Sequence, residues 1–400
     1  MRVLPVALVT AIVAGLAGCG GGGGSPAKIS PVEQAKKGVP VLGQHGDEQP
    51  AGPALGFPVF ATKNTTRVGG ADPVADAAAV AQAVFPSRSS DTRPDAVVLV
   101  DQDDWRAGLA ASELAAPPLR APVLLVEGKN LPDATKSALD KLQPRGEKAA
   151  GGAQVIRIGA VASPSGLKGT QVATGSPAAT ARAIDRLQIA AAGRKHLAQN
   201  VIVASADKPD FAMPAAGYAA KSGDPVLWTS RDTLPAETRA AIQAHGKPHI
   251  YLLGPPSVIS AKVEDQLKRL GTVKRVGAAD AVGNAIAFAR FADGDFGWGI
   301  TDPGHGFVFA SSGRTLDAAA AAPLSTSGTY GPLLLIPDAQ ALPSTVQDYL
   351  LDVQPGYDKN PVRGVYTHGW LMGDEAAISA DVQSRIDTLL EIQPVNTGGD

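Results

Sequence analysis

A short apolar phrase occurs three times along this chain of 400 residues, and a Leu-Pro pair follows each copy a few residues later. The Leu-Pro pairs stand 103 and 108 residues apart, so the spacing is nearly even. A recurrence this regular indicates one folding unit copied in tandem. Three such units leave little length for a separate catalytic domain. The copies are Ala121–Leu125 with Leu131-Pro132, Asp224–Trp228 with Leu234-Pro235, and Gly331–Leu335 with Leu342-Pro343.

The composition is that of a globular protein without a strong overall charge. Hydrophobic residues make up 44% of the chain and charged residues 18%, and the formal net charge is −2. The basic footprint of a nucleic-acid-binding protein is absent. Local groups would have to hold any anionic partner. Aromatic residues are few, at 5%, and alanine is abundant, so we expect cores built from small side chains.

The N-terminus has the features of a bacterial lipoprotein leader. A basic residue, Arg2, precedes an apolar run over Val3–Leu16, which is typical of an export signal and too short for a membrane-spanning helix. Leu16-Ala17-Gly18-Cys19 resembles a lipobox, which implies cleavage before Cys19 and its lipidation. Residues 20–400 contain no cysteine, so they can form neither a disulfide nor a thiolate metal site. A Gly/Pro-rich tether is expected over residues 20–60.

The second copy shows the plan of one unit most clearly. Apolar runs predict buried strands, and alanine-rich or amphipathic segments between them predict helices. Leu234-Pro235 should open the middle helix, because proline is tolerated at the first helical position. The predicted strands are 200–204, 225–228 and 249–254, and the predicted helices are 211–221, 235–245 and 260–270.

The other two copies follow the same plan. Strands alternating with helices favour parallel βαβ units, so the sequence predicts three tandem Rossmann-like α/β subdomains with parallel sheets. The first copy lacks room for its final helix, because only a short segment, 163–169, follows its third strand. The predicted strands are 97–100, 122–126 and 155–159 in the first copy, and 306–310, 332–336 and 364–367 in the third.

These phrases resemble the cell wall-binding repeat 2 family of bacterial surface proteins. The resemblance spans residues 61–393 and rests on an arginine-led entry, a Pro-Ile-Leu-Leu-like strand and the Leu-Pro helix start. It implies three units packed with pseudo-threefold symmetry that bind an anionic polysaccharide or teichoic-type polymer of the cell wall. We place repeat 1 at 61–168, repeat 2 at 169–272, repeat 3 at 273–393 and a tail at 394–400.

Some positions depart from the family pattern. Trp228 breaks the apolar phrase in repeat 2, which also lacks the entry arginine. The Asp-Ala step of the family survives as Asp317-Ala318 in repeat 3, whereas Ala107 and Phe211 stand at that place in the other two repeats. The resemblance therefore supports the fold for all three repeats and does not imply that every repeat binds polymer.

Two kinds of residue are candidates for polymer binding. The entry arginines, Arg67 and Arg275, can hold an anion in a bidentate fork, or else form contacts within the fold. Ligands of open parallel sheets bind beyond the carboxyl ends of the strands, which points to the loops 101–106, 205–210 and 311–317. The third loop suits an anion best. Its candidate residues are Ser311, Ser312, Arg314, Thr315 and Asp317.

No catalytic motif was found in the sequence, and we expect neither an enzyme nor a bound cofactor or metal. His245 and His249 have a metal-ligand spacing, but Gly246 and Pro248 interrupt the helix, so we interpret both histidines as surface-loop residues. His305 and His368 are interpreted as structural.

The features together favour a non-enzymatic protein, lipid-anchored to the membrane and facing the cell wall, which binds an anionic glycopolymer. A solute-binding lipoprotein of a transporter shares the anchor and the α/β character, but normally has two lobes. A wall-modifying hydrolase would need a catalytic domain for which the repeats leave no room.

Overall fold

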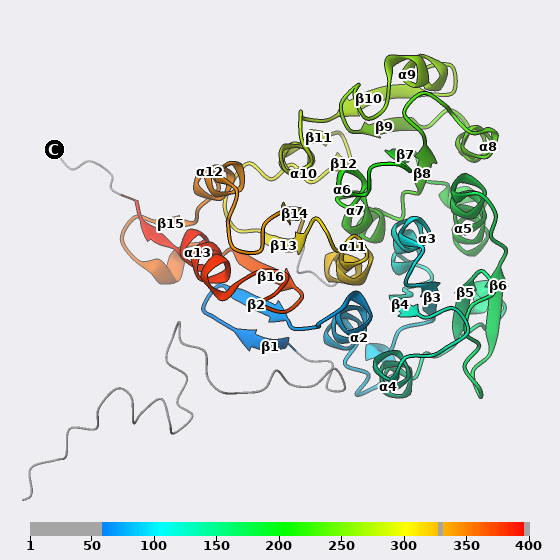
Figure 1. The fold of residues 1–400 in the computed structure, drawn as a ribbon, viewed down its shortest axis with the longest axis horizontal. Coiled ribbons are helices and arrows are strands. Elements are labelled where there is room, and N and C mark those ends of the chain that lie inside the picture. The colour runs from blue at the N-terminus through cyan, green and yellow to red at the C-terminus, as the bar shows by residue number, and fades with distance from the viewer. Residues whose placement is uncertain (1–57, 327–330, 396–400) are drawn as a thin grey trace, which may run out of the picture. The chain divides into compact units, whose positions relative to one another are not determined.

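A computed structural model describes residues 58–326 and 331–395 of the chain. The predicted signal peptide, the Cys19 anchor and nearly all of the tether lie outside these residues. The described residues fall within one compact unit. Figure 1 shows its sheets and helices.

Three parallel sheets have the same strand order. In each sheet the first strand of a repeat lies between the second and the third, and a further strand follows the third. The fold class predicted from the sequence, tandem Rossmann-like parallel sheets, is therefore confirmed. The sheets are β4 (Val123–Val126), β3 (Val97–Asp101), β5 (Val155–Ile158), β6 (Gly169–Val172); β8 (Val226–Thr229), β7 (Asn200–Ser205), β9 (His249–Leu253), β10 (Thr272–Val276); and β14 (Leu333–Ile336), β13 (Gly306–Ser311), β16 (His368–Met372), β2 (Thr65–Val68).

The fourth strand of each sheet comes from the start of the following repeat. β6 begins repeat 2 and β10 begins repeat 3, yet they pair with β5 and β9 of the repeats before them. For the third sheet this strand is β2, from the N-terminal end of repeat 1. The N-terminal and C-terminal segments therefore lie side by side, blue against orange-red in Figure 1, and the three repeats close into a ring. A short strand, β1 (Pro58–Ala61), adds to β2 in the antiparallel sense.

The helix after each of these fourth strands packs against the next sheet along the chain. α2 (Pro73–Val84), α5 (Pro177–Ala192) and α10 (Ala281–Arg290) contact β4, β8 and β14, respectively. Each repeat thus gives a strand to one sheet and a helix to the next. This exchange of elements joins neighbouring repeats more firmly than surface contacts between separately folded repeats would.

Alanine-rich helices fill the centre of the ring. The helix that follows the first strand of each repeat runs into this centre, where the three meet (Figure 1). Their residues are almost all fully buried. Small side chains allow helix axes to approach closely, which confirms the core expected from composition. These helices are α3 (Trp105–Ala111) with the 3-10 turn Ser112–Ala115, α7 (Ala215–Ser222), and α11 (Asp317–Ala321) with the 3-10 turn Ala322–Thr326.

The three Leu-Pro pairs start three equivalent helices. Pro132, Pro235 and Pro343 are the N-caps of α4 (Asp133–Leu142), α8 (Ala236–Ala244) and α12 (Ser344–Asp352). Each proline has φ near −60° with an extended ψ, so the helix begins one residue later than predicted. Proline favours this boundary because its ring fixes φ and it carries no N–H.

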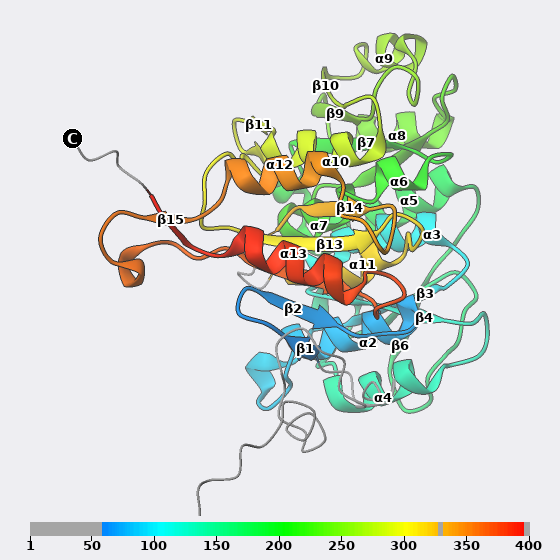
Figure 2. The ribbon, with the colours of Figure 1, turned by 60° about the vertical axis from the view of Figure 1, so that its left-hand side comes forward.

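The final helix of the unit is present in two repeats only. α9 (Ala261–Leu267) joins the third and fourth strands of the second sheet, and α13 (Ala380–Leu390) follows the third strand of the third sheet. Figure 2 shows α13 running along β16 and β2. In repeat 1, residues 159–168 connect β5 to β6 without a helix, as the short spacing predicted.

Two local predictions were wrong. The third strand of repeat 3 is β16, at His368–Met372, and not 364–367. Val365 and Tyr366 suggested a strand by residue type, but they are 49% and 59% exposed. The helix predicted over 211–221 is broken into α6 (Pro209–Ala212) and α7, because Pro214 interrupts the hydrogen-bond ladder.

Trp228, which departs from the apolar phrase, belongs to the contact between repeats 1 and 2. Its buried ring meets Trp105 of α3 edge-to-face, with centroids 5.5 Å apart. Arg106 in turn lies over the Trp105 ring and donates a hydrogen bond from Nε to the Ala206 carbonyl at 2.7 Å. Trp228 thus stands where the other repeats have a core leucine, and its larger ring contacts the neighbouring repeat.

Candidate functional site

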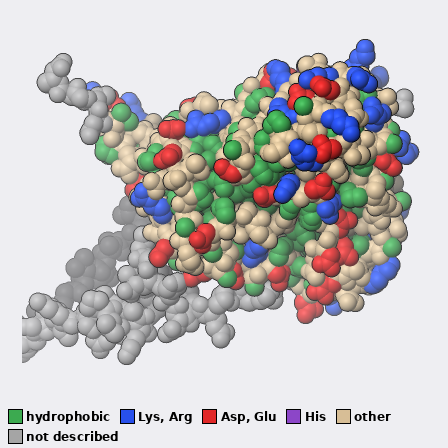
Figure 3. Space-filling view, turned by 45° about the horizontal axis from the view of Figure 1, so that its top comes forward, with side chains coloured by type: hydrophobic (Ala, Val, Ile, Leu, Met, Phe, Trp, Pro, Cys, Tyr) green, Lys and Arg blue, Asp and Glu red, His purple; other side chains and the backbone are tan. Residues whose placement is uncertain are grey.

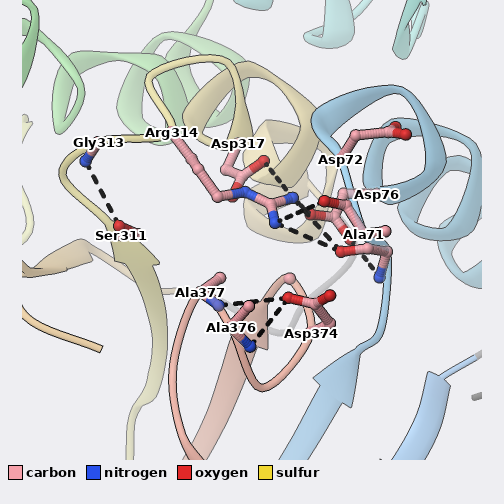
Figure 4. A network of polar contacts seen from close by, with 12 residues as sticks. Ala71, Asp72, Asp76, Ser311, Gly313, Arg314, Asp317, Asp374, Ala376 and Ala377 are labelled. Carbon is pink, nitrogen blue, oxygen red and sulfur yellow. Dashed lines mark hydrogen bonds and ion pairs between the residues drawn. The ribbon is translucent and has the colours of Figure 1, made fainter. Parts of the chain in front are cut away.

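The loop after β13, predicted to suit an anion, is built around Arg314. Its guanidinium points to the N-terminal end of α2, as Figure 4 shows, and forms an ion pair with Asp76 at 2.5 Å. A second ion pair joins Arg314 Nε to Asp317 at 2.8 Å. Longer hydrogen bonds run to the carbonyls of Gly70 and Ala71. The loop therefore fastens repeat 3 to repeat 1.

The charges of this cluster balance within the fold. Asp76 and Asp317 are fully buried. Burial raises the pKa of Asp317 to about 6 even though Arg314 opposes the shift. Burial, together with the charge of Asp317, also holds the pKa of Asp76 well above its usual range. Burial would lower the pKa of Arg314, but the two carboxylates outweigh it and raise that pKa. The guanidinium is consequently not an unpaired cation.

The other residues of this loop serve mainly its own turn. Gly313 N donates to Ser311 Oγ at 3.4 Å, and Ser312 N donates to the Ile336 carbonyl at 3.3 Å. The Thr315 carbonyl accepts from Ala318 N at 3.2 Å. Ser311, Ser312 and Thr315 are half-buried. The structure brings all five predicted residues together, and their contact with a polymer stays a prediction.

Arg67 is directed into the fold. It is only 3% exposed and lies on β2, where it donates to the carbonyls of Gly373, Asp374 and Ile378 at 2.7–3.0 Å. Its Nε donates to Gln383 at 2.9 Å. Burial lowers the pKa of this guanidinium. Arg67 therefore holds the loop after β16 in place. Of the two alternatives that the sequence left open for this residue, it takes the contact within the fold.

Arg275 occupies the equivalent position on β10. Its Nη1 donates to the carbonyl of Gly254, which follows β9 as Gly373 follows β16, at 2.7 Å. An ion pair of 2.6 Å joins it to Glu264 on α9. In the first sheet the same register position, on β6, carries Gln171. Both predicted arginines thus secure the loop after a third strand, and neither offers a free guanidinium.

The distribution of charge among the repeats favours repeat 2 as the site of an anionic ligand. Repeat 2 contains twelve Lys and Arg against eight Asp and Glu, a formal charge of +4. Repeat 1 has thirteen against twelve, and repeat 3 has seven against fourteen. The loop favoured from the sequence therefore belongs to the most acidic repeat. An anionic ligand would be drawn to repeat 2.

Six cations of repeat 2 lie on or directly after three neighbouring helices, α5, α8 and α9. α5 contacts α8, and Arg239 of α8 donates to Gln266 of α9 at 3.1 Å. Figure 3 shows Lys and Arg gathered at the upper right, over the region where Figure 1 places α8 and α9. We call this set the basic face. It comprises Arg182, Arg186, Arg239, Lys262, Lys268 and Arg269.

Several side chains of the basic face have no acidic partner. The side chains of Arg182, Arg186 and Arg269 make no hydrogen bond or ion pair with any residue that the structure describes. Lys268, by contrast, is paired with Glu264 and Asp265 at 3.2 and 3.0 Å. Helices α5, α8 and α9 carry four cations and four acids, and two more cations follow α9 directly, whereas the corresponding helices of repeat 3, α10, α12 and α13, carry two cations and four acids. A count of charges per repeat, available from the sequence, would have found this face.

The interpretation of His245 as a surface residue was wrong. It is the C-cap of α8 and is buried, with Nε2 3.0 Å from Asp185 and Nδ1 3.1 Å from the Ala198 carbonyl. Burial by itself would lower its pKa, but the hydrogen bond and charge of Asp185, the bond to the Ala198 carbonyl and the charge of Asp224 together raise it. Glu113 and Asp224 are buried at the same contact between repeats 1 and 2, and burial raises the pKa of each. His249 is exposed, as expected.

Within residues 58–326 and 331–395, no group of three His, Cys, Asp or Glu side chains is arranged to hold a metal ion. In the same residues, no helix has the length and apolar character needed to cross a membrane.

Comparisons with known proteins agree with this architecture. The family model for cell wall binding domain 2 matches residues 178–264, which lie within repeat 2. Cwp6 from Clostridium difficile superposes with a TM-score of 0.65 at 18% identity, over 82% of this chain and 48% of Cwp6. Cwp8 from the same organism gives 0.62 at 17% identity, over 82% and 52%. The chain spans about half the length of these solved structures. Among curated proteins no match was found.

Proposed function

We propose that this chain, whose residues 178–264 match the family model for cell wall binding domain 2, attaches to an anionic glycopolymer of the cell wall through the basic face of repeat 2. One observation carries this proposal: the residues matched by the family model, 178–264, form the repeat with the clear excess of positive charge. A polyanion is attracted by several cations together, because each one adds to the local potential.

The geometry of the basic face suits an extended chain. Arg182 and Arg186 stand one turn apart on α5, and Arg239 lies on the helix that packs against it. Arginine can hold phosphate or carboxylate groups in bidentate fashion, which adds direction to the electrostatic attraction. Repeats 1 and 3 then serve chiefly to hold repeat 2 within the ring.

The proposal includes anchorage at the membrane. Lipidation of Cys19 would fix the N-terminus, and the Gly-rich segment after it would let the ring reach the wall. A single acyl group binds a membrane weakly, so retention would depend on the full lipid modification together with wall binding. We propose a non-enzymatic role at this extracytoplasmic location.

Cosedimentation with purified cell walls tests the proposal. We expect retention on intact walls, a marked loss on walls stripped of anionic polymer, and weakening as salt is raised, because salt screens exposed charges. The Arg182→Glu/Arg186→Glu variant should bind poorly. Arg385→Glu, at an exposed arginine on α13 of repeat 3, is the matched control and should bind normally. Equal binding by both variants at every salt concentration would refute a role for the basic face.

A further inference from the structure

Repeat 1 contains a hollow of about 570 Å³ that lies where the other repeats carry their final helix. Its walls come from α4, from the segment 143–154 and from the helix-free connection 164–167. This volume falls within the range of about 300–1,000 Å³ that is usual for small-ligand sites. The hollow exists because repeat 1 lacks a counterpart of α9 and α13.

One equivalent side chain in the three repeats loses its partner where the final helix is missing. The fourth residue after the helix-starting proline is Lys136 in repeat 1, Arg239 in repeat 2 and Gln347 in repeat 3. Arg239 bonds to Gln266 of α9, and Gln347 accepts hydrogen bonds from Arg385 of α13 at 3.0 and 3.2 Å. Lys136 has no such helix to meet and lines the hollow, and its side chain makes no hydrogen bond or ion pair with the described residues.

A second cation of the hollow is also unsatisfied. Arg93 lines it, and its Nε is buried without a hydrogen-bond partner in the part of the chain that the structure describes. A buried donor without a partner destabilises the fold, and a ligand oxygen in the hollow would satisfy it. Arg145 also lines the hollow, although Asp95 already pairs with it. Asp140 is the single acid among the lining residues.

The rest of the lining combines amide and hydroxyl groups with apolar surface. Gln143 and Ser165 can exchange hydrogen bonds with hydroxyl groups, and Leu131 and Leu167 offer apolar contact. Gln154 also lines the hollow, but its amide already bonds to the Pro144 carbonyl and to Lys168 N. A sugar ring presents both kinds of surface, and the cations require that it carry a negative charge. We infer that the hollow of repeat 1 binds a single anionic sugar unit, bearing a phosphate or a carboxylate.

This site lies outside the basic face, so the inference stands without the proposed function. Isothermal titration of the full chain with glucose 1-phosphate, glucuronate, glucose and inorganic phosphate tests it. We expect at least one of the two charged sugars to bind more tightly than both glucose and inorganic phosphate. Binding of neither charged sugar would overturn the inference. If glucose bound as tightly as the charged sugars, the negative charge would not be needed for binding. If inorganic phosphate bound as tightly, the sugar ring would not be needed. Either result would also overturn the inference.

Two variants of the lining and two control variants test whether the sugar binds in the hollow. Arg93→Gln should weaken the charged sugar by about tenfold or more, corresponding to about 1.4 kcal/mol. Ser165→Trp, in an exposed loop, should block the hollow without changing any charge. Lys129→Gln removes an exposed cation of repeat 1 outside the lining and should bind normally. Arg182→Glu/Arg186→Glu should also bind the sugar normally, which separates this site from the basic face. Unchanged binding in both Arg93→Gln and Ser165→Trp would overturn the assignment.

Discussion

Arg314 Nη2 lies 2.5 Å from Asp76 Oδ2, and this ion pair joins repeat 3 to repeat 1 across 238 positions of sequence. Together with the pairing of β2 and β16 it closes the ring. Arg314→Met should therefore destabilise the protein by about 3–5 kcal/mol, because it leaves two buried carboxylates without their cation. Urea unfolding at neutral pH measures this loss.

Two further variants complete that test. Arg290→Met removes an exposed ion pair with Asp352 and should cost less than about 1 kcal/mol. Adding Asp76→Asn and Asp317→Asn to Arg314→Met should restore much of the lost stability, since no buried charge then remains. A loss for Arg314→Met no larger than for Arg290→Met would show that the pair does not hold the ring closed.

The stability of the ring should depend on pH through Asp224. Burial raises the pKa of this carboxyl from 3.8 to about 6. The folded state then binds the proton more tightly than the unfolded state, so stability is greatest below pH 4 and falls as the pH rises through about 6. The full change from this group is about 3 kcal/mol. Asp224→Asn should flatten the dependence of the unfolding free energy between pH 4 and 7, and an unchanged slope would contradict the assignment.

Arg67 should matter more to stability than Arg275, although both hold the same kind of loop. Arg67→Met leaves the carbonyls of Gly373, Asp374 and Ile378 without their donor in a buried place, so we expect a loss of about 3 kcal/mol. Arg275→Met removes a half-exposed ion pair and one carbonyl bond, and should cost about 1 kcal/mol. Hydrogen exchange should accelerate in residues 373–378 for Arg67→Met. Equal losses in the two variants would argue against the burial-based explanation.

Restoring the family pattern at Trp228 should weaken the protein. Trp228→Leu matches Leu125 and Leu335, which occupy the same register position in the other sheets. It would nonetheless leave a cavity beside Trp105, and should cost somewhat less than the roughly 3–5 kcal/mol typical of a buried Trp→Ala change. A double-mutant cycle with Trp105→Leu should give a coupling of about 1 kcal/mol for the ring contact. A stabilising Trp228→Leu would mean that this departure has no part in joining repeats 1 and 2.

The sequence by itself determined the repeated unit, most strands, the three helix starts at Leu-Pro and the absence of a final helix in repeat 1. These are local properties, since hydrophobic periodicity and proline act within a few residues of their own position. Only the tertiary structure decided which sheet each entry strand joins, so that β2 closes the third sheet. It also decided that Arg67 is buried, that Arg314 is neutralised by Asp76 and that His245 meets Asp185. Each of these depends on a partner far away in the sequence, because burial and charge balance are set by whichever distant segment packs alongside.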